Sequence, residues 1–116
     1  MIDKEYKRAV LETISLIADP EAQIQYEKDV PIAHIPSELI CIWFDDRYHP
    51  GTKVFNATFT EEERKILKDF NQEYDSLLKN VSEEAESGTV LDLHKDKYWC
   101  EIMNIAKQTL RKLQNV

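Results

Sequence analysis

The residues best suited to chemistry stand together at positions 45–49, where the sequence reads DDRYH after an apolar run that ends at Phe44. If this stretch is helical, Asp45 and His49 are four residues apart and lie on the same side of the helix. A carboxylate and an imidazole placed in this way can share a divalent metal ion, but two ligands do not complete a site. A third ligand would have to come from elsewhere: His34, His94 or Asp46.

The spacing of these residues gives no further support to a metal centre. The sequence contains no HExxH motif, no ExxH pair and no repeated carboxylate motif. A simpler interpretation is that DDRYH is the polar end of a buried helix, where His49 meets the last carbonyl groups before Pro50-Gly51 ends the element. We therefore expect no bound metal and no cofactor, and keep a metal-dependent enzyme or metal-binding protein centred on Asp45 and His49 as the alternative.

Nucleophilic catalysis is also poorly supported. Cys41 with His34 or His49 would be the pair to consider, but Cys41 lies inside the apolar run, where burial raises a thiol pKa. Only two glycines occur, so no glycine-rich loop can hold a phosphate. We expect Cys41 and Cys100 to be buried free thiols of a reduced compartment, and we expect that the protein is not an enzyme.

The charge balance indicates which partners the chain can bind. It has 15 basic and 22 acidic residues, a net charge of −7, which opposes binding to nucleic acid or to anionic membranes and favours basic partners. The first ten residues, MIDKEYKRAV, contain no apolar signal core, and no stretch of about 20 apolar residues occurs. These features predict a cytoplasmic protein.

The chain that carries these residues is predicted to be helical. Asp3 can cap a first helix over 3–18, and Pro20 can open a second to about Lys28. Thr60 and Glu63 have the spacing of a capping box at the start of a helix over 60–81. The remaining helices are expected over about 36–49 and from Asp92 or Asp96 to near the end.

One region allows a second interpretation. The run from Ile40 to Phe44 could be a strand paired with 54–59, giving an α+β fold with one short hairpin at 38–59. An isolated hairpin is marginal in water, and only 89–94 offers a third strand. We predict an all-α fold, a small bundle of about five helices forming a single helical domain over 1–116.

Acidic and aromatic residues near this region suit a protein interface. Carboxylates steer association with a basic partner, and aromatic rings supply desolvated anchors. We expect Trp43 in the core. The predicted partner-binding residues are Glu38, Asp45, Asp46, Tyr48 and Tyr26. Another possibility is a homodimeric structural or regulatory adaptor that buries part of the helix at 60–81.

Two stretches, IPSELICIWFDDRYHP and FNATFTEEERKILKDFNQEYD, resemble a pattern of small bacterial proteins in which an acidic–aromatic helix end precedes a capped helix. In size and acidity the chain also resembles the immunity proteins that bacteria make against their own secreted toxins. This resemblance implies a non-catalytic protein-binding module, an immunity or inhibitor protein that neutralises a basic toxin.

Overall fold

The computed structural model describes residues 2–116, and every regular element in that range is helical. The elements are α1 (Lys4–Ala18), α2 (Pro20–Asp29), α3 (Ile35–Cys41), the π-helix η1 (Ile42–Arg47), α4 (Lys53–Thr58), α5 (Glu61–Leu78), α6 (Glu83–Ser87), α7 (Val90–His94) and α8 (Lys97–Gln114). The all-α prediction is confirmed. The hairpin alternative is wrong, because 54–59 falls largely in α4 and 89–94 largely in α7.

The count of about five helices is too low because short helices replace expected loops. The segment 82–88 contains α6. Ser82 is the N-cap of this helix, and its side chain accepts a hydrogen bond from the Ala85 N–H. The last helix was expected from Asp92 or Asp96, and α8 begins directly after Asp96, whose carboxylate accepts from the N–H groups of Tyr98 and Trp99. These caps satisfy backbone N–H groups that a first helical turn leaves unpaired, and they stabilise short helices that also pack against the core.

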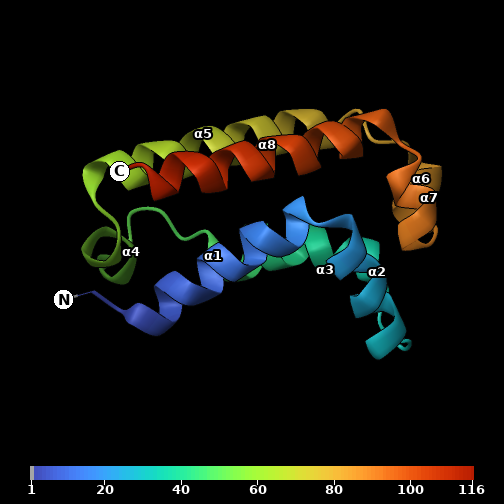
Figure 1. Ribbon diagram of the computed structural model, residues 1–116, viewed down its shortest axis with the longest axis horizontal. Coiled ribbons are helices and arrows are strands. Elements are labelled where there is room, and N and C mark those ends of the chain that lie inside the picture. The colour runs from blue at the N-terminus through green and yellow to red at the C-terminus, as the bar shows by residue number, and fades with distance from the viewer. Residues whose placement is uncertain (1) are drawn as a thin grey trace.

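The long helices form two layers (Figure 1). α5 and α8 lie side by side and antiparallel in one layer, and α1 and α3 lie beneath them in the other. α2, α6 and α7 gather at one end of the molecule, and α4 lies at the other end near both chain termini. This arrangement places η1 between α1 and α5.

The space between the layers is filled by apolar side chains. The stripe of α5 formed by Leu67, Phe70 and Tyr74 is buried, and so is the stripe of α8 that includes Trp99 and Ile102. The apolar stripe of the helix at 60–81 therefore faces the core of its own chain, and a homodimer would have to use another face of α5.

Carboxylates fix the ends of several helices. The Thr60–Glu63 capping box is present, with the Thr60 hydroxyl accepting from the Glu63 N–H at 3.1 Å and the Glu63 carboxylate accepting from the Thr60 N–H at 2.9 Å. Asp3 caps α1 as predicted, and Asp19 caps α2 just before Pro20. Many acids of this chain thus have a structural role.

Within residues 2–116, no helix is both long and apolar enough to cross a lipid bilayer.

Candidate functional site

The DDRYH stretch is built on a π-helix. The Tyr48 N–H donates to the Trp43 carbonyl at 3.0 Å, a bond from residue i+5 to residue i. The π-helix covers residues 42–47 only, so Tyr48 and His49 lie beyond its end, and Tyr48 has an extended backbone. The predicted α-helical alignment of Asp45 with His49 is therefore wrong, because η1 ends at Arg47 and the His49 ring contacts the Asp46 carbonyl at 3.0 Å.

The prediction that His49 meets a carbonyl at the helix end is confirmed by that same contact. His34 lies at the start of α3, which is the end of that helix away from η1. His94 lies on a different helix, at the end of α7. Among the described residues, no three His, Cys, Asp or Glu side chains lie in a group that could hold a metal ion.

Side chains from α1 and α5 hold the π-helix in place. The Tyr6 hydroxyl donates to the Arg47 carbonyl at 2.6 Å, and Arg47 Nε donates to the Thr13 hydroxyl at 3.2 Å. Trp43 is fully buried, as predicted, and its indole N–H donates to Asn71 Oδ1 at 3.0 Å. These bonds fix both the backbone and the buried face of η1.

The opposite face of α3 and η1 carries exposed carboxylates. Glu38, Asp45 and Asp46 all lie at the surface, and none of them belongs to an ion pair of the described residues. Desolvation, followed by the negative charges of Asp45, Glu38 and Asp46, raises the pKa of the Cys41 thiol. Glu38 lies three residues before Cys41 and Asp45 four residues after it on continuous helical backbone, so both carboxylates lie on the same side of the helix as the thiol. We call Glu38, Asp45 and Asp46 the acidic face.

The expected burial of both cysteines is wrong, since Cys41 and Cys100 are exposed free thiols. In the apolar run, only Leu39 and Trp43 are fully buried, because the helical period turns Cys41 away from them towards solvent. Desolvation and the neighbouring negative charges both disfavour the thiolate and raise the thiol pKa, and this makes Cys41 a poor nucleophile despite its exposure.

The two predicted tyrosines occupy different places. Tyr48 is half-buried, and its ring stacks on Trp43 and meets Phe55 edge to face, so it belongs in part to the aromatic core. Tyr26 is half-buried on α2, a helix that packs against α1, α3 and α7. Tyr26 therefore lies on α2, the helix before α3, and Tyr48 lies directly after the last residue of η1.

A buried polar cluster was missed by the sequence reasoning. Gln23 is fully buried, and its amide nitrogen donates to the carbonyls of Leu16 and Ile17 at 2.9 and 3.0 Å. Its oxygen must then be the acceptor for the Trp99 indole N–H at 3.3 Å and for His94 Nε2 at 2.8 Å. The cluster joins α1, α2, α7 and α8. A glutamine between Ala22 and Ile24 gives no pattern by which this role could be found.

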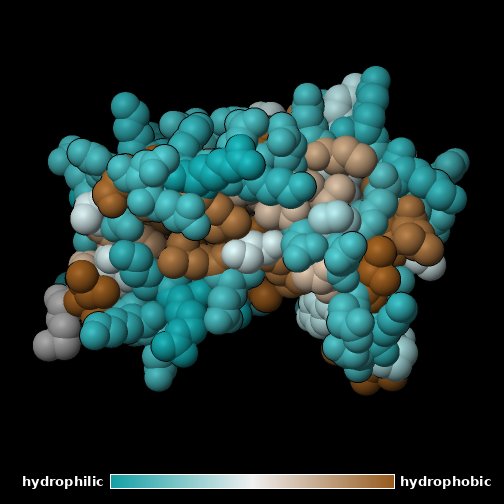
Figure 2. Space-filling model, viewed as in Figure 1, coloured by the Kyte–Doolittle hydropathy of each residue, from teal (hydrophilic) through white to brown (hydrophobic). Residues whose placement is uncertain are grey.

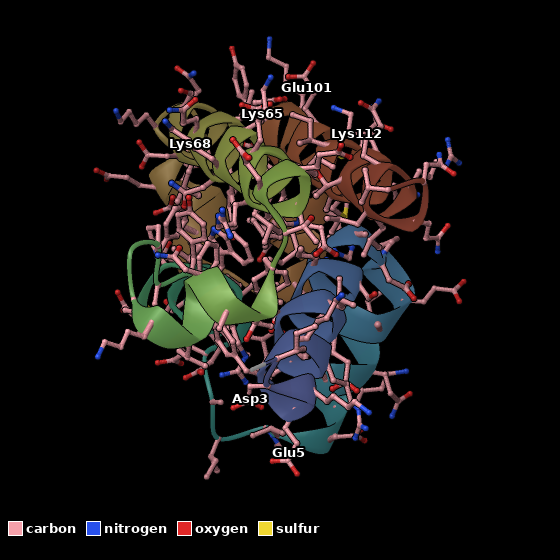
Figure 3. The ribbon with its side chains drawn as sticks, turned by 90° about the vertical axis from the view of Figure 1, so that its left-hand side faces the viewer. Asp3, Glu5, Lys65, Lys68, Glu101 and Lys112 are labelled. Carbon is pink, nitrogen blue, oxygen red and sulfur yellow. The ribbon has the colours of Figure 1, made fainter. Side chains whose placement is uncertain are left out.

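A groove between α5 and α8 is the other feature of note. Its volume is about 480 Å³, and its lining includes the half-buried Leu77 and Ile105 and the exposed Glu73 and Glu101. Figure 3 shows side chains of both signs, among them Lys65 and Glu101, projecting outward from this layer. The charged residues that line the groove, Glu73 and Glu101, are both acidic, and they do not by themselves identify a ligand or a reaction.

Comparison with protein-family models, with curated proteins and with solved structures finds no match to this chain.

Proposed function

We propose that this protein is a non-catalytic binding module whose acidic face binds a basic protein. The observation that carries the proposal is the shared exposure of Glu38, Asp45 and Asp46 on the continuous helical segment of α3 and η1, where none of them belongs to an ion pair of the described residues. Other carboxylates, such as those of Asp19 and Glu63, cap helices. The acidic face has no such internal role among the described residues.

The rigidity of η1 supports a role in binding. The Tyr6 hydroxyl donates to the backbone at the end of the π-helix, and Thr13 and Asn71 accept hydrogen bonds from its Arg47 and Trp43 side chains. A surface that is already ordered loses little conformational entropy on association, so more of the electrostatic attraction remains as affinity. π-Helical turns are frequent at functional positions in proteins.

The specific form that we propose is an immunity or inhibitor protein that neutralises a basic toxin. A toxin that cleaves nucleic acid must present cations to the phosphate backbone. Carboxylates fixed on a small acidic protein can occupy those cations and exclude the substrate, and the net charge of −7 accelerates the encounter.

Affinity capture with three forms of the protein tests this proposal. The forms are the wild type, the double variant Asp45→Asn/Asp46→Asn, and the control Asp69→Asn/Glu73→Gln, which removes two exposed charges from α5 instead. We expect wild type and control to retain one basic protein at low salt and to release it at high salt, and the double variant to retain much less. Equal retention by all three forms, or a partner that salt does not release, would contradict the proposal.

A further inference from the structure

The turn between α2 and α3 presents one apolar side chain to solvent. Ile32 is 97% exposed, more than any other large apolar residue of the described chain, of which Leu91 is next at 59%. Figure 2 shows hydrophobic atoms at the tip of the lobe formed by α2. Single exposed apolar residues are common on proteins, so the exposure alone does not define a contact.

The backbone on either side of Ile32 is fixed. The Ala33 N–H donates to the Val30 carbonyl at 3.1 Å, closing a β-turn with Pro31 at its second position and Ile32 at its third. The Val30 N–H in turn donates to the Tyr26 carbonyl at 2.9 Å, and both Val30 and Ala33 pack against the core. A proline at this position restricts the turn to few conformations.

The α3 side of the turn is anchored as well. The His34 ring lies 2.6 Å from the Ser37 hydroxyl and 3.0 Å from the Gly88 carbonyl, so it ties the start of α3 to the loop before α7. Ile32 is thus held out on a short support that is tied to the fold at both ends. An apolar side chain held in this way meets a partner without first losing backbone freedom.

The charges beside the turn indicate which partner it fits. Asp29 ends α2 just before the turn, and Glu38, a member of the acidic face, lies in the first turn of α3 just after it. Lys28 is the one cation among residues 26–38. The apolar tip therefore has an exposed carboxylate on either side of it along the chain, and one of the two belongs to the acidic face that we propose for binding a basic partner.

We infer that Ile32 is the apolar anchor of the partner interface: it enters a small apolar socket on the partner whose rim carries lysine or arginine side chains that pair with Asp29 and Glu38. This inference rests on the proposed function. It adds an apolar contact, which the carboxylates of the acidic face cannot supply. Full burial of a side chain of this size is worth about tenfold or more in affinity.

A photoreactive benzoylphenylalanine at position 32 tests the inference in cells of the organism that encodes the protein. The same residue at position 91, in place of the exposed Leu91 of α7, is the control. We expect position 32 to form a covalent product with one basic protein and position 91 to form none with it. A product containing two copies of this chain, or no product at position 32, overturns the inference.

The captured protein is then purified and titrated with Ile32→Ser, Ile32→Val, Leu91→Ser and Asp45→Asn/Asp46→Asn. We expect Ile32→Ser to weaken binding about tenfold or more, with Ile32→Val and Leu91→Ser close to wild type. Because the Ile32 side chain is almost wholly exposed, all position-32 variants should have the same melting temperature as the wild type. Wild-type affinity for Ile32→Ser with weak binding by the aspartate variant overturns the anchor but retains the proposed function. Wild-type affinity for both overturns both.

Discussion

The rings of Trp43 and Tyr48 stack with their centroids 5.2 Å apart and their planes 15° apart, and the Tyr48 N–H donates to the Trp43 carbonyl in the i+5 pattern of a π-helix. Trp43 also meets Phe70 edge to face at 4.9 Å, and Tyr48 meets Phe55 edge to face at 5.6 Å. The two residues joined by the π-helical hydrogen bond are therefore both packed against buried aromatic rings, and this packing stabilises the π-helix.

Replacement of Tyr48 by alanine should lower the free energy of unfolding by about 2 kcal/mol, less than the loss for a fully buried ring because Tyr48 is half-buried. Tyr48→Phe keeps the ring and should leave stability within about 0.5 kcal/mol of wild type. Urea denaturation of both variants measures the difference. Equal stability of the alanine variant and the wild type would show that the stack does not hold η1.

The bond from Tyr6 to the end of η1 gives a second prediction. Tyr6→Phe removes the hydroxyl that donates to the Arg47 carbonyl and should cost about 1 kcal/mol of stability. Tyr26→Phe is the matched control, since the Tyr26 hydroxyl makes no hydrogen bond within the described chain. Chemical denaturation of the pair should separate them, and equal midpoints would contradict the assignment.

The buried Gln23 cluster should be far more sensitive than its neighbour on the same helix. Gln23→Leu leaves the Leu16 and Ile17 carbonyls and the Trp99 indole N–H without their partner, at a cost of about 2–4 kcal/mol. Gln25→Leu removes only an exposed bond to Asp29 and should change stability by about 0.5 kcal/mol or less. Thermal or urea unfolding of both variants tests this; similar losses would contradict it.

His94 should make stability depend on pH. Desolvation lowers the pKa of His94 below its ordinary value of 6.5, against the nearby charge of Glu27, which raises it. The unfolded chain therefore takes up a proton at higher pH than the folded chain. The stability from neutral His94 is complete above about pH 6.5 and declines as the pH falls below it.

The matched variant for that prediction is His94→Gln, whose amide can still donate to Gln23 Oε1. Between neutral and mildly acidic pH, the wild type should lose more stability than this variant, because the glutamine side chain does not titrate. His34 and His49 are present in both proteins, so they do not contribute to the difference. Denaturant unfolding across that range measures the loss. Parallel curves would show that His94 titrates alike in the folded and unfolded states.

Local signals in the sequence predicted much of this fold. The capping box of Thr60 and Glu63 and the cap at Asp3 involve groups three residues apart, so their hydrogen bonds follow from local spacing. The burial of Trp43 follows from the helical period. Interactions of this range depend little on the rest of the chain.

The remaining features depend on contacts between distant segments. The rings of Phe55 and Phe70 pack against Tyr48 and Trp43, which the π-helical hydrogen bond joins, and the burial of Gln23 requires carbonyls of α1 and the indole of Trp99. The exposure of Ile32 depends on a turn that the chain places beyond the core. None of these leaves a periodic or spacing pattern in the sequence.

The central claim, that the acidic face binds a basic partner, is tested most directly by calorimetric titration of the captured partner across a series of salt concentrations. Asp45→Asn/Asp46→Asn should bind about tenfold weaker than wild type at low salt, and its affinity should fall less steeply as salt rises. The control Asp69→Asn/Glu73→Gln, with the same loss of charge, should keep the wild-type affinity and salt dependence. Identical curves for the double variant and the wild type would contradict the claim.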